Sequence, residues 1–160
     1  MEMNLNEVNE AHVGAVVTLD FFKGDIRKDT KGNILNEHVD SKVYKNLLLT
    51  VGKGLMMDRL FGLGAAGAMT RIGVGTNSSA ASASNTTLTG SVYKAYDGTP
   101  TRAGTVVTCT TTFGTGDANI SWNEMGMDNG TTLLNRLAPI GPFNKTSAVS
   151  IVATIVFTQN

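Results

Sequence analysis

Residues 148–158 read Ala-Val-Ser-Ile-Val-Ala-Thr-Ile-Val-Phe-Thr, a run dominated by apolar and β-branched residues. Side chains along a β-strand point alternately to its two faces, so every second residue from Val149 to Phe157 would share one face. The other face is also apolar near the end of the run, and a strand apolar on both faces belongs inside a sheet. We therefore expect a central strand here, with four core residues: Val149, Ile151, Ile155 and Phe157.

Several shorter segments before this strand have the same Thr-rich β character. Turn residues separate them, for example Asp97-Gly98, Asn129-Gly130 and the stretch Gly114–Asp117. Many short strands with turns at such spacing are typical of a mainly β protein with a β-sandwich or jelly-roll-like domain. The expected strands are Thr70–Gly75, Thr86–Tyr96, Thr105–Phe113, Asn119–Met127 and Thr131–Leu137.

One helix is expected, over residues 43–61. Its apolar residues recur at spacings of three and four, which would form one stripe of Tyr44, Leu47, Leu48, Val51 and Leu55, with Met56 at its margin. Asp40 or Ser41 could cap its start, and Gly62 is a natural stop. Gly52 and Gly54 would weaken it by about 1 kcal/mol each relative to alanine. They could also let another backbone approach closely.

The N-terminal part has a different character. Residues 1–12 are rich in Asn and Glu and have no apolar period running through them, so we expect an arm that contacts another polypeptide. Residues 13–42 read as a β-hairpin-like element, which gives a division into residues 1–42 and residues 43–160, the latter holding the helix and the β-sandwich. The candidate partner contacts in the arm are Glu2, Asn4, Asn6, Glu7, Asn9 and Glu10.

Composition limits the kinds of partner. The 160 residues hold 13 Lys plus Arg and 13 Asp plus Glu, so the net charge is zero and long-range attraction to nucleic acid or an anionic membrane is disfavoured. Low charge favours self-association. The one cysteine, Cys109, reads as a small apolar strand residue and suits a reducing compartment. No apolar run reaches the length of a membrane span, and the N-terminus does not resemble a signal peptide.

Chemistry-bearing motifs are few. The glycine run Gly62–Gly67 follows a helix candidate rather than opening one, so we expect a linker and no nucleotide site. His12 and His38 have no partner at metal-ligand spacing, so no metal, cofactor or catalytic residue is expected. A carboxylate on an apolar face needs a partner, and we expect Glu124 to pair with a cation such as Arg136 or Arg71.

Read in order, these segments resemble a family of small virion structural proteins of tailed bacteriophages. The resemblance covers roughly residues 44–160 and rests on the order of stretches similar to the usual motifs of the family. These are I-G-V-G-T-G, an Ala/Pro/Thr loop, T-x-L, F-G-x-G-x-A-N, E-x-G-L, L-A-R and P-x-x-K before a terminal strand. Met127 stands where Leu is common, and the loop after Gly75 lacks the usual prolines. The matching stretches are Arg71–Thr76, Thr87-Leu88, Phe113–Asn119, Trp122–Met127 and Pro142–Thr146.

The resemblance implies a non-enzymatic virion protein, assembled in the bacterial host cytoplasm. We favour a capsid cement or decoration protein that binds the major capsid protein. It is expected to form a homo-oligomer, and a trimer is one state that fits this expectation. A tail, collar or fibre-base subunit is the alternative within this class. From a different class, a carbohydrate-binding β module could use Trp122, Tyr93 and Tyr96 to stack on a sugar.

Overall fold

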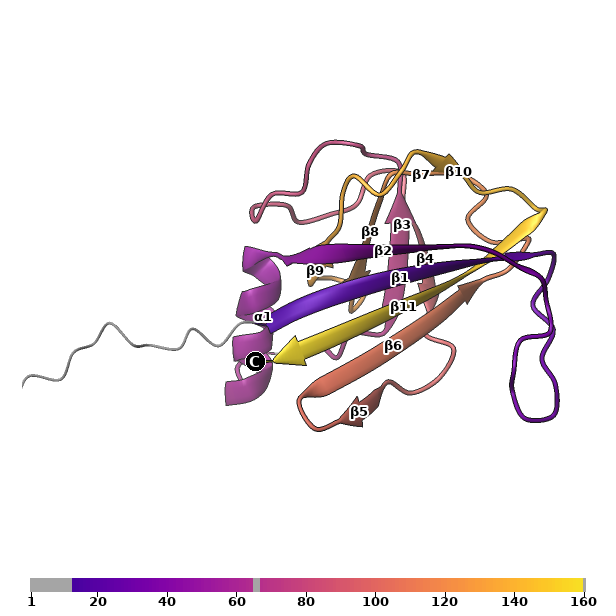
Figure 1. The fold of residues 1–160 in the computed structure, drawn as a ribbon. Coiled ribbons are helices and arrows are strands. Elements are labelled where there is room, and N and C mark those ends of the chain that lie inside the picture. The colour runs from indigo at the N-terminus through magenta and orange to yellow at the C-terminus, as the bar shows by residue number, and fades with distance from the viewer. Residues whose placement is uncertain (1–12, 65–66, 160) are drawn as a thin grey trace, which may run out of the picture.

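The computed structural model describes residues 13–64 and 67–159, and it confirms a mainly β, sandwich-like domain with one helix (Figure 1). The N-terminal arm expected over residues 1–12 lies outside the described residues. The elements in chain order are β1 (Val13–Lys23), β2 (His38–Leu48), α1 (Thr50–Phe61), β3 (Arg71–Gly75), β4 (Val92–Ala95), β5 (Thr101–Ala103), β6 (Val106–Phe113), β7 (Ser121–Trp122), β8 (Glu124–Asp128), β9 (Asn135–Arg136), β10 (Phe143–Asn144) and β11 (Val149–Gln159).

Two sheets and a short ribbon make up the domain. The larger sheet has the order β5-β6-β11-β1-β2-β9, the smaller one has the order β4-β3-β8, and β10 pairs with β7. β11 lies between β6 and β1, antiparallel to both, so that Ile155 is opposite Cys109 on one side and Val17 on the other. The expected central position of the last strand is therefore confirmed.

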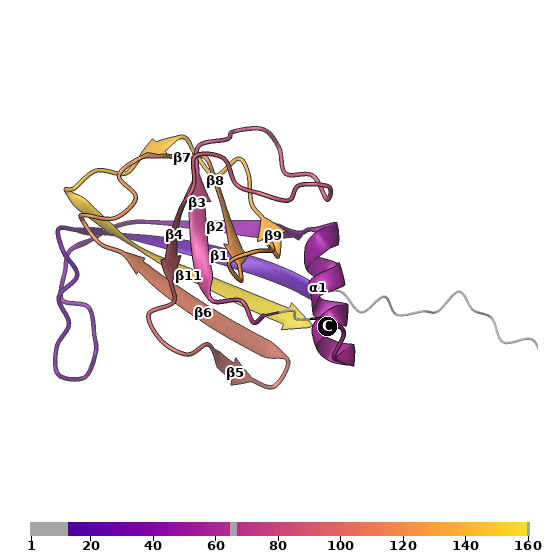
Figure 2. The ribbon, with the colours of Figure 1, turned by 180° about the vertical axis from the view of Figure 1, so that it is seen from behind.

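The two sheets are linked at both sides. Next to β9, the amides of Leu134 and Leu137 donate to the carbonyls of Met127 and Met125 in β8, each at 2.8 Å. After β4, the amide of Asp97 donates to the carbonyl of Thr110 in β6 at 2.9 Å. The sheets consequently curl into a half-barrel, with the smaller sheet crossing the larger one when the molecule is seen from behind (Figure 2).

The main hydrophobic core fills the space between the sheets, and a smaller cluster of Leu49, Leu88 and Leu133 lies apart from it. Ile151 and Ile155 are fully buried in the main core, as expected, but Val149 and Phe157 are only partly buried and pack against its edge. The prediction that Phe157 is a core residue is therefore only partly correct, because the residue lies near the end of β11, at the open end of the half-barrel, and is only partly buried. The fully buried large apolar side chains include Val17, Leu19, Ile72, Phe113, Trp122 and Met125.

The predicted start of the helix is wrong. Residues 43–48 continue β2, which pairs with β1 from His38 to Asn46, and the helix begins at Thr50. Its N-cap residue is Leu49, with no capping side chain, so neither Asp40 nor Ser41 caps it. The apolar spacing of residues 43–48 did not distinguish a helix from a strand, because two residues four positions apart share a face in both. The predicted stop is confirmed, since Gly62 ends the helix in the left-handed region with φ 65°.

Two other expectations need adjustment. The segment Thr86–Tyr96 holds only the short strand β4, and Thr131–Leu137 holds only β9, so most of both segments is loop. Some of their backbone amides bond to side chains, which alternation alone does not predict. The Thr89 amide donates to Glu124, and the amides of Thr131 and Thr132 donate to Asn129. The proposed division between residues 42 and 43 falls inside β2, and β1 pairs with both β2 and β11, so the hairpin shares its strands with the larger sheet.

The two helix glycines are expected to respond oppositely to alanine. A Cβ at Gly52 would overlap the backbone carbonyl of Leu134, whereas Gly54 faces open space. We expect Gly52→Ala to lower the free energy of unfolding by about 1–3 kcal/mol. Gly54→Ala should raise it by up to about 1 kcal/mol, because alanine is the better helix former. Urea denaturation of the two variants measures both, and equal effects at the two positions would contradict this packing.

Candidate interaction surface

The helix α1 exposes most of its apolar side chains. Only Gly52 and Leu55 of its twelve residues are buried, while Met57, Leu60 and Phe61 are exposed by 52%, 73% and 64%. Leu63, just after the helix, is exposed by 57%. A helix that is apolar on several sides normally lies in a protein interior. We call Met57, Leu60, Phe61 and Leu63 the helix patch.

The strand before the helix adds to this exposed apolar surface. Val39, Val43 and Leu47 of β2 all lie in the exposed class, although β2 is an inner strand of the larger sheet. Isolated exposed apolar residues are ordinary, but a gathering of them on successive elements marks an interaction site. The helix patch and the end of β2 are therefore the strongest candidate for a surface that is covered by another protein.

An apolar groove runs between α1 and the open end of the half-barrel. It consists of two adjoining cavities of about 320 and 410 Å³, and Met56, Met69 and Leu134 line both. Val107 and Phe157 line the barrel side of the first cavity, so the edge position of Phe157 in the core is explained by this opening. Methionine side chains adapt to irregular apolar partners, which suits a groove that binds a peptide. We call this feature the Met groove.

The groove is uncharged on its barrel side. Cys109 and Tyr96 line it, and burial raises the pKa of the Cys109 thiol and of the Tyr96 hydroxyl above their ordinary values. Both groups therefore stay protonated and neutral at pH 7. The thiolate is the nucleophilic form of cysteine, so Cys109 is not activated here. This agrees with its reading as a small apolar strand residue.

Glu124 and Arg136 form a buried ion pair, as the sequence led us to expect. The Nε of Arg136 donates to Oε2 of Glu124 at 2.6 Å, and both side chains are almost completely buried. Arg136 also donates to the carbonyl of Ser79 at 3.0 Å and to Oδ1 of Asn85 at 2.9 Å, while Glu124 accepts from the amide of Thr89 at 2.6 Å. The pair thus holds the Ser/Ala-rich loop of residues 76–90 against the sheet, which is a structural role.

The aromatic residues considered for sugar stacking are not presented to solvent together. Trp122 is fully buried, and its Nε1 donates to the carbonyl of Ala118 at 2.9 Å. Tyr93 is partly buried with the guanidinium of Arg71 4.4 Å from its ring centre, and Arg71 in turn pairs with Asp128. The hydroxyl of Tyr96 is buried. A sugar platform made of these three residues is therefore contradicted.

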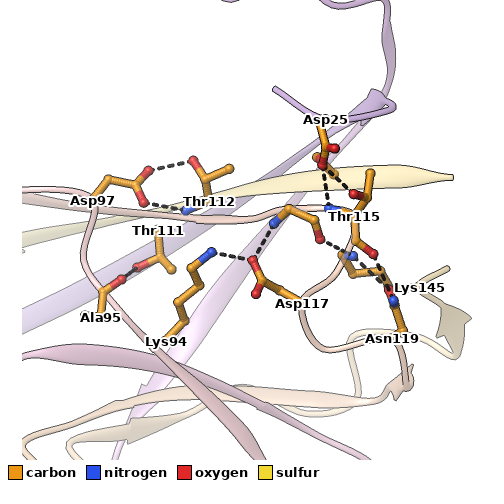
Figure 3. Close-up of polar contacts among 12 residues, drawn as sticks. Asp25, Lys94, Ala95, Asp97, Thr111, Thr112, Thr115, Asp117, Asn119 and Lys145 are labelled. Carbon is orange, nitrogen blue, oxygen red and sulfur yellow. Dashed lines mark hydrogen bonds and ion pairs between the residues drawn. The ribbon is translucent and has the colours of Figure 1, made fainter. Parts of the chain in front are cut away.

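The turn between β6 and β7 collects polar side chains from distant parts of the chain (Figure 3). Lys145 is 4% exposed, and its ammonium donates to the carbonyl of Gly114 at 2.7 Å and to Oδ1 of Asn119 at 3.0 Å. The carboxylate of Asp117 accepts from the Gly114 amide at 2.8 Å and pairs with Lys94, and Asp25 accepts from Thr115. Each charge is satisfied within the cluster, so the turn reads as a structural junction.

This junction makes acid sensitivity a testable property. The hydrogen bond from Lys94 lowers the pKa of Asp117 below its ordinary value of 3.8. A carboxyl whose pKa is lowered by folding stabilises the protein above pH 3.8 and loses that contribution as pH falls through the lower folded value. We expect Asp117→Asn to be less stable than the wild type at pH 6, with the difference shrinking towards pH 2. Urea midpoints across this range test it, and a constant difference would contradict it.

The remaining sequence motifs carry no chemistry in the described residues. Gly73 and Gly75 lie in β3, where a Cβ would overlap Tyr93 and Glu124, so the segment is a closely packed strand. His38 lies near Asp20, with 3.4 Å between Nε2 and Oδ1, and it packs edge-on against Phe22. Within residues 13–64 and 67–159, no group of three or more His, Cys, Asp or Glu could hold a metal ion. The run Gly62–Gly67 follows α1, as expected of a linker, although residues 65 and 66 lie outside the described part.

The candidate partner contacts also lie outside the described residues: Glu2, Asn4, Asn6, Glu7, Asn9 and Glu10. Sequence reasoning missed the helix patch and the Met groove, because it assigned the apolar residues of the helix to an internal stripe. The signal that could have found them is the crowding of Met56, Met57, Leu60, Phe61 and Leu63, which is more than one buried stripe can hold.

Comparison with known proteins adds no relative. No family model matches the chain, and neither a curated protein nor a solved structure is significantly similar to it. Within residues 13–64 and 67–159, no helix is long and apolar enough to cross a membrane.

Proposed function

We propose that this chain is a non-enzymatic structural subunit of a tailed-phage virion, and that it decorates the capsid by binding the major capsid protein. The single observation that carries an assembly role is the helix patch, since α1 leaves Met57, Leu60 and Phe61 exposed. A subunit whose helix is apolar on several sides gains stability when another protein covers it. The phage context itself rests on the resemblance of the sequence motifs.

The kind of contact follows from the charges. The chain holds 13 basic and 13 acidic residues, and the helix patch has no charged member. Attachment should therefore depend on apolar burial and short hydrogen bonds, with little electrostatic steering. A tail, collar or fibre-base subunit would use the same kind of contact, and the copy number per particle distinguishes the two positions.

We expect attachment to depend on the helix patch and to be nearly independent of salt. Purified protein is titrated onto particles stripped of it, using the wild type, Phe61→Glu and the control Thr101→Glu in the exposed strand β5. Phe61→Glu should weaken binding at least about tenfold, because an interface anchor is replaced by a charge. Thr101→Glu should bind like the wild type.

The same titration at two salt concentrations separates the contact types. A loss of tenfold or more from about 50 to about 200 mM salt is the response of an interface with many charged contacts, and it would contradict the apolar reading. Unchanged binding of Phe61→Glu would remove the helix patch from the interface and, with it, the main structural support for the proposed role.

A further inference from the structure

The Met groove lies where residues 1–12 join the domain. Val13, the first residue of β1, pairs with Gln159 of β11, and Gln159 lines the first cavity of the groove. The start of β1 and the end of β11 lie beside α1 (Figure 1). The preceding twelve residues therefore connect to the domain at the rim of an open apolar groove.

The sequence of residues 1–12 has features that match such a groove. Although no period runs through the whole segment, Met1, Met3 and Leu5 alternate with polar residues. In an extended backbone these three side chains share one face. The segment also holds three glutamates and no lysine or arginine. It therefore offers a short apolar edge together with negative charge.

The groove complements the apolar edge of the segment. Its walls are apolar and rich in methionine, and its barrel side is neutral. We propose that the Met groove receives the N-terminal segment of a second copy of this chain, with Met1, Met3 and Leu5 as the apolar anchors. Extended peptides are commonly held in this way, by side chains of one face entering pockets.

Two features of the segment's sequence favour a second copy over the same one. Val13, where the segment joins the domain, is already paired with Gln159 of β11. Residues 1–12 contain no glycine or proline, which most readily reverse a chain. Twelve extended residues span about 40 Å, well beyond the domain's radius of gyration of about 15 Å.

An exchange of this kind deepens the assembly role proposed above. The segment of one copy would fill the groove of the next, which is a head-to-tail contact that can close into a ring. Leu60 lines the second cavity and so belongs to both surfaces, but Met57 and Phe61 line neither cavity. That part of the helix patch would remain available for a different subunit.

Two full-length variants test the exchange by complementation. Met56→Arg blocks the groove and keeps the segment, while Met3→Ser with Leu5→Ser keeps the groove and removes two anchors. Sedimentation velocity should find the wild type associated and each variant alone weakened at least about tenfold. A mixture of the two variants should form a one-to-one complex, because it still contains one intact segment and one intact groove.

Gly54→Arg is the matched control, since it places the same charge on the same helix outside both the groove and the helix patch, and it should associate like the wild type. Circular dichroism melts confirm that all variants fold. A folded mixture that stays monomeric would overturn the proposal, as would a wild type that is monomeric throughout. If the wild type is monomeric, a loss of stability in Met3→Ser with Leu5→Ser would mean that the segment binds the groove of its own copy. Unchanged stability would instead mean that the groove is a site for a small apolar molecule.

The test is independent of the virion assignment. If the protein is present in particles but the complementation fails, the groove inference alone is lost. If complementation succeeds but the protein is absent from particles, the virion role alone is lost.

Discussion

Arg136→Met is expected to lower the free energy of unfolding by about 3–5 kcal/mol, the range for removing one partner of a buried ion pair. The variant leaves the Glu124 carboxylate fully buried with its Oε2 unpaired. It also removes the donors that hold the carbonyl of Ser79 and the side chain of Asn85. Urea denaturation at pH 7 measures the loss, and limited proteolysis should find new cleavage in residues 76–90.

A double variant separates the charge from the shape. Arg136→Met with Glu124→Met removes both charges, so it should recover a part of the stability that Arg136→Met loses. A double variant that is as unstable as the sum of the two single ones would mean that the loop contacts, rather than the unpaired carboxylate, cause the loss. A loss under about 1 kcal/mol in Arg136→Met would contradict a structural pair altogether.

Trp122→Ala is the second change with a large expected effect, again about 3–5 kcal/mol. Trp122 is fully buried between Phe113 and Phe143, with ring centres 4.9 and 5.3 Å away. Alanine would leave a cavity at the centre of the core and remove the indole hydrogen bond to the carbonyl of Ala118, which would keep only the bond from the amide of Ile120. Thermal and urea unfolding measure the loss.

Phe61→Ala is the matched control for this prediction. Phe61 is an aromatic residue of the helix patch and is largely exposed, so its removal should change the stability of the isolated subunit by less than about 0.5 kcal/mol. If Phe61→Ala proves as destabilising as Trp122→Ala, then α1 is packed against the domain and the helix patch is not available to a partner.

The strands with clear alternation could be predicted from the sequence. In β6 and β11, one face is apolar and the other is a row of Thr and Val, and both strands lie where the pattern indicated. The Glu124 partner could also be predicted, because a carboxylate on a buried face requires a cation. In both cases the local sequence pattern and one physical requirement predicted the structure that is observed.

Other features depend on contacts that the sequence does not contain. Residues 43–48 fit both a helix and a strand, and the pairing of β2 with β1 decides the outcome. The turn at Gly114–Asn119 is held by Lys145, Lys94 and Asp25, which come from three distant segments. The exposure of Leu60 and Phe61 follows from the position of α1 at the end of the barrel, which no periodicity specifies.

The motifs behind the phage resemblance have structural roles here. Lys145, from the P-x-x-K motif, bonds to Gly114 and Asn119 of the F-G-x-G-x-A-N motif. Glu124, from the E-x-G motif, pairs with Arg136 and thereby orders the Ser/Ala-rich loop. Residues of this kind maintain a fold, whereas the helix patch and the Met groove would determine which proteins the subunit binds.

Quantitative mass spectrometry of purified particles, produced from the genome that encodes this chain, tests the central claim most directly. The account predicts that the protein copurifies with intact particles in a copy number comparable with that of the major capsid protein. A copy number that instead matches the tail or collar proteins would move the subunit to that alternative position. Absence of the protein from particles that are otherwise complete would contradict a virion role.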